Sequence, residues 1–110
     1  MLEGILGNAT AERVLLYMEQ YGEGYGKGIA DNFDDLTLSM VQRQLERFER
    51  AGLLVSVLKG RTRVFSWNPR FAFLREVRAL LRTALAALPD EEKRRYFRER
   101  RRPRRTGKPL

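Results

Sequence analysis

The side chains best suited to chemistry lie close together in residues 37–51. Glutamine can pair with adenine through two hydrogen bonds and arginine with guanine, serine can reach a base or a phosphate, and methionine can touch a thymine methyl. Threonine is a common N-cap, and the backbone amides near such a helix start can hold a phosphate. The candidates are Thr37, Ser39, Met40, Gln42, Arg43 and Arg47. These residue types predict contact with double-stranded DNA.

The composition gives little support for catalysis or metal binding. The chain has no cysteine and no histidine, so thiolate metal sites and the commonest general acid–base are missing. Residues 22–28 hold four glycines and a lysine. A phosphate-binding P-loop would need Gly-Lys-Ser/Thr after a strand, whereas this run follows a helical pattern, so we interpret it as a turn with a short extended piece at 25–27. We expect no enzyme activity and no cofactor.

A second group of basic residues lies around a predicted hairpin turn. Residues 53–58 and 62–67 are rich in β-forming side chains and flank Lys59-Gly60-Arg61. Lys59, Arg61 and Arg63 would then lie at the tip of the hairpin or on its returning strand. Beside a DNA-reading helix, residues 55–67 would contact the phosphate backbone or the minor groove.

The positive charge of the chain is concentrated at its end. The net charge is +8, but residues 93–110 hold ten basic residues and one acid, while residues 1–92 hold twelve bases and thirteen acids. Residues 37–66 carry six bases and two acids, a local excess of four positive charges in a body that is otherwise slightly acidic. This local excess is better evidence for a nucleic-acid face than the total.

Helical periodicity predicts the elements that would position these residues. A helix should start at Asn8 and end near Gly22, a short helix should cover 29–33, and a helix should follow Thr37 and stop at Gly52. The last of these has an apolar stripe made of Val41, Leu45 and Phe48. A long helix is expected at about 69–88 and a charged one at 91–102.

This order of elements predicts a mainly α fold with a β-hairpin wing (α+β), the winged helix-turn-helix with a C-terminal dimerisation helix. Residues 1–92 would form the domain, and residues 93–110 an Arg-rich and partly disordered tail.

The long helix near the end of the domain has its own apolar stripe. Its members recur in steps of three and four: Leu74, Val77, Leu81, Ala84 and Leu88. Such a stripe is either packed inside one chain or forms a seam between two copies. Because this helix lies at the edge of an already small domain, we favour a dimer interface.

Residues 36–54, LTLSMVQRQLERFERAGLL, resemble the recognition helix and its exit in winged-helix repressors of the arsenical-resistance-repressor (ArsR) type. The similarity continues through Lys59-Gly60-Arg61 and the segment from Arg63 to Pro69, and covers roughly residues 5–88. It implies a homodimer that binds a near-palindromic operator and represses transcription. Metal-sensing members carry Cys or His in the recognition or terminal helix, and this chain has neither, so metal sensing is not expected.

Two other functions remain open at this stage. The basic tail favours an RNA-binding or non-specific nucleic-acid-binding protein, and winged helices also serve as protein–protein interaction modules. The N-terminus lacks a signal-peptide pattern and no apolar run is long enough for a membrane span, so we expect a cytoplasmic protein. The sequence does not indicate an effector.

Overall fold

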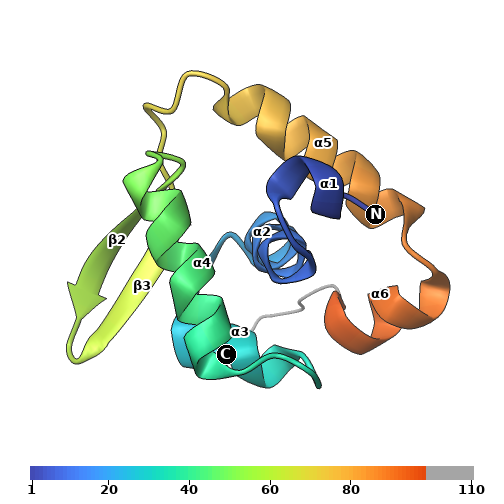
Figure 1. The fold of residues 1–110 in the computed structure, drawn as a ribbon, viewed down its shortest axis with the longest axis horizontal. Helices are drawn as coiled ribbons and strands as arrows, with labels where there is room; N and C mark the ends of the chain where they lie inside the picture. The colour runs from blue at the N-terminus through green and yellow to red at the C-terminus, as the bar shows by residue number, and fades with distance from the viewer. Residues whose placement is uncertain (99–110) are drawn as a thin grey trace, which may run out of the picture.

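The computed structural model describes residues 1–98 of the chain and combines helices with one antiparallel sheet (Figure 1). In these residues the elements are α1 (Glu3–Leu6), α2 (Ala9–Tyr21), β1 (Glu23–Tyr25), α3 (Gly26–Asn32), α4 (Leu38–Arg50), β2 (Leu54–Lys59), β3 (Thr62–Trp67), α5 (Leu74–Ala87) and α6 (Asp90–Tyr96). The α+β class expected from the sequence is confirmed.

The two longest helices of the first half, α2 and α4, begin and end where local signals predict. The side chain of Asn8 accepts a hydrogen bond from the amide of Ala11, and the hydroxyl of Thr37 accepts one from Met40. Each cap satisfies one amide that the first turn of the helix leaves without a partner. Gly22 and Gly52 follow these helices at φ values of +88° and +86°, which favour glycine.

The three strands form a sheet in the order β1-β3-β2. β2 and β3 make the predicted hairpin, in which Lys59 pairs with Thr62 around Gly60. The extended piece in the glycine-rich run lies two residues earlier than predicted, at Glu23–Tyr25, because it pairs with β3. A local pattern could not indicate this long-range pairing.

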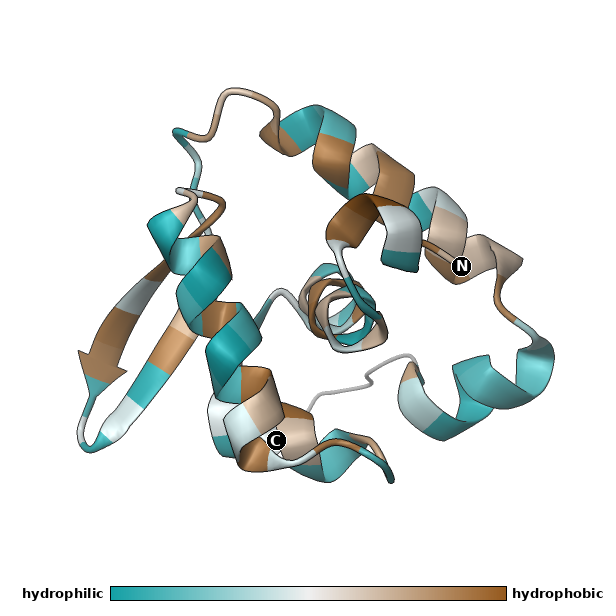
Figure 2. Ribbon diagram, in the orientation of Figure 1, coloured by the Kyte–Doolittle hydropathy of each residue, from teal (hydrophilic) through white to brown (hydrophobic). Residues whose placement is uncertain are grey.

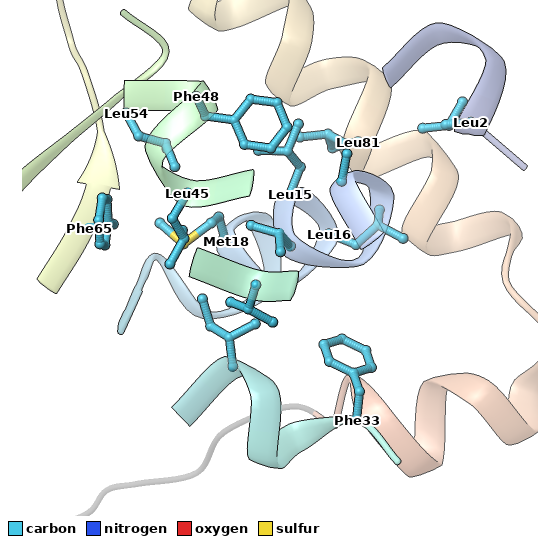
Figure 3. Packing of buried hydrophobic residues seen from close by; sticks show 14 of the residues in the cluster. Leu2, Leu15, Leu16, Met18, Phe33, Leu45, Phe48, Leu54, Phe65 and Leu81 are labelled. Carbon is cyan, nitrogen blue, oxygen red and sulfur yellow. The ribbon is translucent and has the colours of Figure 1, made fainter. Parts of the chain in front are cut away.

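Helix α2 occupies the centre of the core (Figure 3). Leu15 and Met18 are fully buried, and they lie among Leu45 of α4, Leu81 of α5 and other apolar side chains. The stripe of α4 therefore faces inward, as predicted, and the opposite side of that helix is left outside.

Helix α5 differs from its prediction in both start and role. It begins at Leu74 rather than near 69, because Asn68 supports a turn in which its side chain donates to the carbonyl of Gly52 and accepts from the amide of Arg70. Leu81 is 0% exposed, Ala84 and Leu88 are also buried, and all three belong to the core that includes α2. The prediction that these three residues form a seam between two copies is therefore wrong. Leu74 and Val77 are half-buried against the same core.

The folded body continues beyond residue 92. The backbone carbonyl of Tyr96 accepts hydrogen bonds from the hydroxyl of Tyr21 and the side-chain amide of Asn32, and Phe97 is buried. The charged helix ends at Tyr96, not at 102, and the predicted boundary at 92/93 is about five residues too early. The rest of the predicted tail, residues 99–110, lies outside the described residues.

Candidate nucleic-acid interface

The outward side of α4 is polar and exposed. Hydrophilic and hydrophobic residues alternate along this helix (Figure 2). Ser39, Met40, Gln42 and Arg43 all lie on the outward side. Within residues 1–98, the side chains of Gln42 and Arg43 make no hydrogen bond or ion pair, so their donors and acceptors face solvent. These four predicted residues share one surface, which is the arrangement a base-reading helix requires.

Thr37 lies at the start of α4, but its hydroxyl is already in use. It accepts from the amide of Met40 at 3.2 Å and lies 3.3 Å from the hydroxyl oxygen of Ser39. Thr37 thus fixes where the helix begins. The amides of the first turn, which have no partner within the helix, remain close to solvent for an anionic group.

Arg47 does not lie on the outward surface, although the sequence analysis placed it there. Its guanidinium donates to the side-chain oxygen of Gln44 at 2.7 Å and to the backbone carbonyl of Leu6, and it lies 4.8 Å from the centre of the Phe48 ring. The side chain is half-buried. Arg47 therefore connects α4 to the end of α1.

The three basic residues of the hairpin differ in how they are held. Arg61 is exposed and has no partner among residues 1–98. Lys59 lies 4.0 Å from a carboxylate oxygen of Glu23, a weak surface pair. Arg63 donates to the hydroxyl of Ser56 at 3.0 Å, and that hydroxyl donates to Glu49 of α4 at 2.6 Å. Arg61 is accordingly the hairpin cation most available to an external anion.

A groove of about 590 Å³ separates α4 from the hairpin. Gln42 and Glu46 line it from α4, and Arg61 lines it from the turn that joins β2 to β3. Tyr25 and Lys27 also line it, and neither was among the site residues predicted from the sequence.

Glycines in residues 22–28 allow Tyr25 and Lys27 to reach that groove. This glycine-rich run was the feature of the sequence that could have identified the two residues. A Cβ on Gly26 would lie 3.2 Å from Gln42, and one on Gly28 would lie 2.8 Å from the Tyr25 ring. Glycine thus lets α3 approach α4 closely. The ammonium of Lys27 donates to Asp31 at 2.9 Å, and this hydrogen bond raises the pKa of Lys27.

A second hollow lies on the other flank of α4. It has a volume of about 260 Å³ and is lined by residues at the start of α2 and of α4: Asn8, Thr10, Ser39, Met40, Arg43 and Gln44. Helix α4 is therefore a polar ridge between two depressions, with the hairpin on one side and α2 on the other (Figure 1).

Within residues 1–98, every helix is too short or too polar to span a lipid bilayer. Comparison of the chain with protein-family models, curated proteins and solved structures found no match.

Proposed function

We propose that this chain is a sequence-specific regulator that binds double-stranded DNA and represses transcription at its operator. The order α2-β1-α3-α4-β2-β3 is compatible with a winged helix-turn-helix, in which α4 is the recognition helix and the β2–β3 hairpin is the wing. The observation that carries the proposal is the pair Gln42 and Arg43. Both are exposed on the polar side of α4, Gln42 toward the groove beside the hairpin and Arg43 toward the hollow beside α2, and neither has a partner in the described part of the chain.

The physical argument starts from the shape of α4. Thirteen residues give a helix about 20 Å long. Its apolar stripe is buried, so it presents a polar ridge that the B-DNA major groove, about 12 Å wide, can admit. In this arrangement Gln42 and Arg43 read base edges, and Met40 contacts a thymine methyl.

The hairpin then supplies phosphate contacts along one side of the helix. Arg61 and Lys59 lie at its tip, and both are exposed. Contacts of this kind set the register of the protein on the duplex without reading sequence.

We also propose a homodimer, with a different seam from the one predicted. After Leu81, Ala84 and Leu88 are buried against the body, an outer stripe remains around α5: Phe73 is 64% exposed, Leu80 is 38% exposed, and Ala87 is also exposed. These three residues are spaced by seven, the repeat that pairs one helix with another. Two copies joined in this way would present two recognition helices to one duplex.

The test is selection of bound duplexes from a random DNA pool at physiological salt, using the whole chain. The proposal expects a two-fold symmetric consensus whose half-sites lie about 34–36 Å apart, one turn of DNA. Enrichment should disappear when Gln42 and Arg43 are both changed to alanine, while residual non-specific affinity stays. A pool that shows no enrichment with the unaltered chain would refute sequence-specific binding.

The same selection, run in parallel with a pool of random single-stranded RNA, separates the two competing functions. An RNA-binding or non-specific binder would retain single-stranded RNA as well as it retains any duplex, and its affinity would depend on the basic C-terminus rather than on α4. A protein–protein interaction module would bind neither nucleic acid. Each of these results contradicts the proposal.

A further inference from the structure

The free edge of β2 is the least protected part of the sheet. In the order β1-β3-β2, the first and last strands form the two edges. Strand β1 has only three residues, begins with a charged one and leads directly into α3. Strand β2 has six residues, pairs with β3 without interruption and lies at the outer side of the sheet (Figure 1). Edge strands are commonly interrupted by a charge, a proline or a bulge, and residues 54–58 contain none of these.

Alternate residues of β2 direct their backbone groups away from β3. The amide of Asn68 donates to the carbonyl of Leu53 at 2.9 Å, just before the strand begins. Bonded and non-bonded pairs alternate along an antiparallel ladder, so every second residue from 53 to 59 bonds to β3. The backbone groups that face the free edge therefore belong to Leu54, Ser56 and Leu58. In residues 1–98 no further strand lies beside them.

The side chains of β2 are also apolar for an exposed edge. Val57 is 55% exposed, Leu58 is 60% exposed, and Val55 is exposed as well. These side chains lie on both faces of the strand, since successive residues point to opposite sides. Exposed apolar side chains together with unpaired backbone groups favour the addition of another strand.

We propose that this edge pairs with the same edge of a second copy of the chain, antiparallel and about a two-fold axis at Ser56. The outward backbone groups then match, because Ser56 lies opposite the partner's Ser56 and Leu54 lies opposite the partner's Leu58. On the outer face of the sheet, Val55 meets the partner's Val57, a favourable apolar pair across strands. This inference goes beyond the proposed function and does not require DNA.

The charges of β2 and its neighbours favour a second copy as the occupant. Lys59 is the only charged residue of the strand and lies three positions from the axis. At about 3.4 Å per residue the two lysines are about 20 Å apart, well beyond the Debye length of about 8 Å. Each Ser56 hydroxyl donates to Glu49 at 2.6 Å and accepts from Arg63 at 3.0 Å. The axis thus gathers two acids and two bases, and their charges balance.

The pairing closes at two copies. A two-fold contact uses the β2 edge of both chains, so the joined sheet has the order β1-β3-β2-β2-β3-β1 and its edges are the two short β1 strands. The hairpin tips lie outside the paired residues. Helix α5 lies on another side of the molecule, so the contact proposed for its outer stripe is compatible with this one (Figure 1).

The charge variant Val57→Lys tests the pairing. In the paired sheet the two new ammonium groups lie two residues apart along the strands, about 7 Å, where like charges repel. The matched control is Thr62→Lys, which adds the same charge at an exposed position of the central strand β3. Both changes are made in the Leu80→Arg variant, so that the contact proposed for α5 does not contribute. Thermal unfolding verifies that each variant folds.

The first readout is sedimentation equilibrium over a wide range of protein concentration. We expect Leu80→Arg, with or without Thr62→Lys, to pass from monomer to dimer as the concentration rises. The variant that also carries Val57→Lys should stay monomeric at concentrations where half of the control is paired. Equal behaviour of the two lysine variants, including no association in either, would overturn the proposal, and so would growth beyond two copies.

Hydrogen exchange of single amides gives a readout specific to the backbone. The amides of Leu54, Ser56 and Leu58 should become protected as the concentration of Leu80→Arg rises, whereas the amide of Val57, bonded to β3, should be protected throughout. Outward amides that exchange freely at every concentration would leave the edge for a strand of another protein and would overturn the pairing of copies.

A cross-link tests the position of the axis. The chain has no cysteine, so Ser56→Cys introduces a single thiol. Opposite residues of a bonded antiparallel pair have Cα atoms about 5.5 Å apart, within the range of about 4.4–6.8 Å that a disulfide spans. Mild oxidation should join Ser56→Cys into a covalent dimer and leave Thr62→Cys monomeric, and equal cross-linking would contradict the axis. None of these experiments uses DNA, so their outcome is independent of the selection that tests the proposed function.

Discussion

Replacing Arg47 with alanine distinguishes a residue that supports the fold from one that binds DNA. Its guanidinium donates to the carbonyl of Leu6 and the side-chain oxygen of Gln44, and it packs over the Phe48 ring. A hydrogen bond from a charged group contributes about 1.5–3 kcal/mol in a buried setting. Arg47 is half-buried, so solvent screens part of this, and we expect a loss of about 2 kcal/mol in the free energy of unfolding.

For a domain of this size, 2 kcal/mol corresponds to a fall in Tm of about 8–16 °C. Calorimetry or circular dichroism during heating measures this directly. The control is Arg47→Met, which keeps most of the apolar stem over the ring but removes the donors, and it should lose less stability than alanine.

Binding measured well below the lowered Tm completes the experiment. We expect Arg47→Ala to keep the salt slope of the unaltered chain, because its guanidinium makes no phosphate contact in this arrangement. An unchanged Tm together with a slope reduced by about one contact would show that Arg47 faces DNA, and would refute the assignment made from its hydrogen bonds.

Three further changes test other parts of the structure. Arg43→Ala should weaken binding to the selected duplex by about 1–3 kcal/mol, relax preference at one base position and leave Tm unchanged, as measured by competition binding and heating; equal loss on all sequences would contradict base reading. Leu81→Ala should lower the free energy of unfolding by about 2–5 kcal/mol in chemical denaturation, because the side chain is fully buried. Leu80→Arg should leave this free energy unchanged and shift the sedimentation of the protein toward monomer. A monomer produced by Leu81→Ala without loss of stability, and none produced by Leu80→Arg, would support the originally predicted seam. Deleting residues 99–110, which leaves Phe97 in the core, should flatten the salt slope without changing the selected consensus; loss of the consensus would place sequence reading in the tail.

Much of the fold could be predicted because its signals are local. A capping side chain and a terminal glycine act on amides and carbonyls within a few residues, so Asn8, Gly22, Thr37 and Gly52 mark helix ends without help from the rest of the chain. The turn at Gly60 does the same for the hairpin. The apolar stripe of Val41, Leu45 and Phe48 likewise indicates which side of α4 is buried, so the main surface of the candidate site was predictable.

Features that depend on partners far along the chain were not predictable. Periodicity shows that one side of a helix is buried, but not whether its own chain or a second copy covers it. The stripe containing Leu81 therefore fitted a dimer seam as well as the core in which it lies. Strand β1 exists because Glu23–Tyr25 pairs with β3, about forty residues away, and its own composition gave little indication.

The concentration of charge at the C-terminus predicts a domain boundary that the structure does not have. The excess of basic residues after residue 92 predicted a tail. The two adjacent aromatic residues within that segment were not taken as evidence that it packs against the body. Tyr96 lies 5.0 Å from Phe33, ring centre to ring centre, and Phe97 is buried in the same region. Two consecutive aromatic residues in a charged segment are thus a signal that the segment packs against the body.

The same distinction applies to the candidate site, where residue type and net charge are weaker guides than what each cation already contacts. Arg47 and Arg63 count equally with Arg43 and Arg61 in the sequence. The first two donate to groups of their own chain, whereas the last two have no such partner within residues 1–98. A cation whose donors are satisfied gains less from a phosphate, because it must first give up those bonds. The available charge therefore lies at Arg43, which lines the hollow beside α2, and at Arg61, which lines the groove beside the hairpin. Under the proposed function, these positions, rather than the excess of four charges, define the surface of α4 and the hairpin that we expect a duplex to meet.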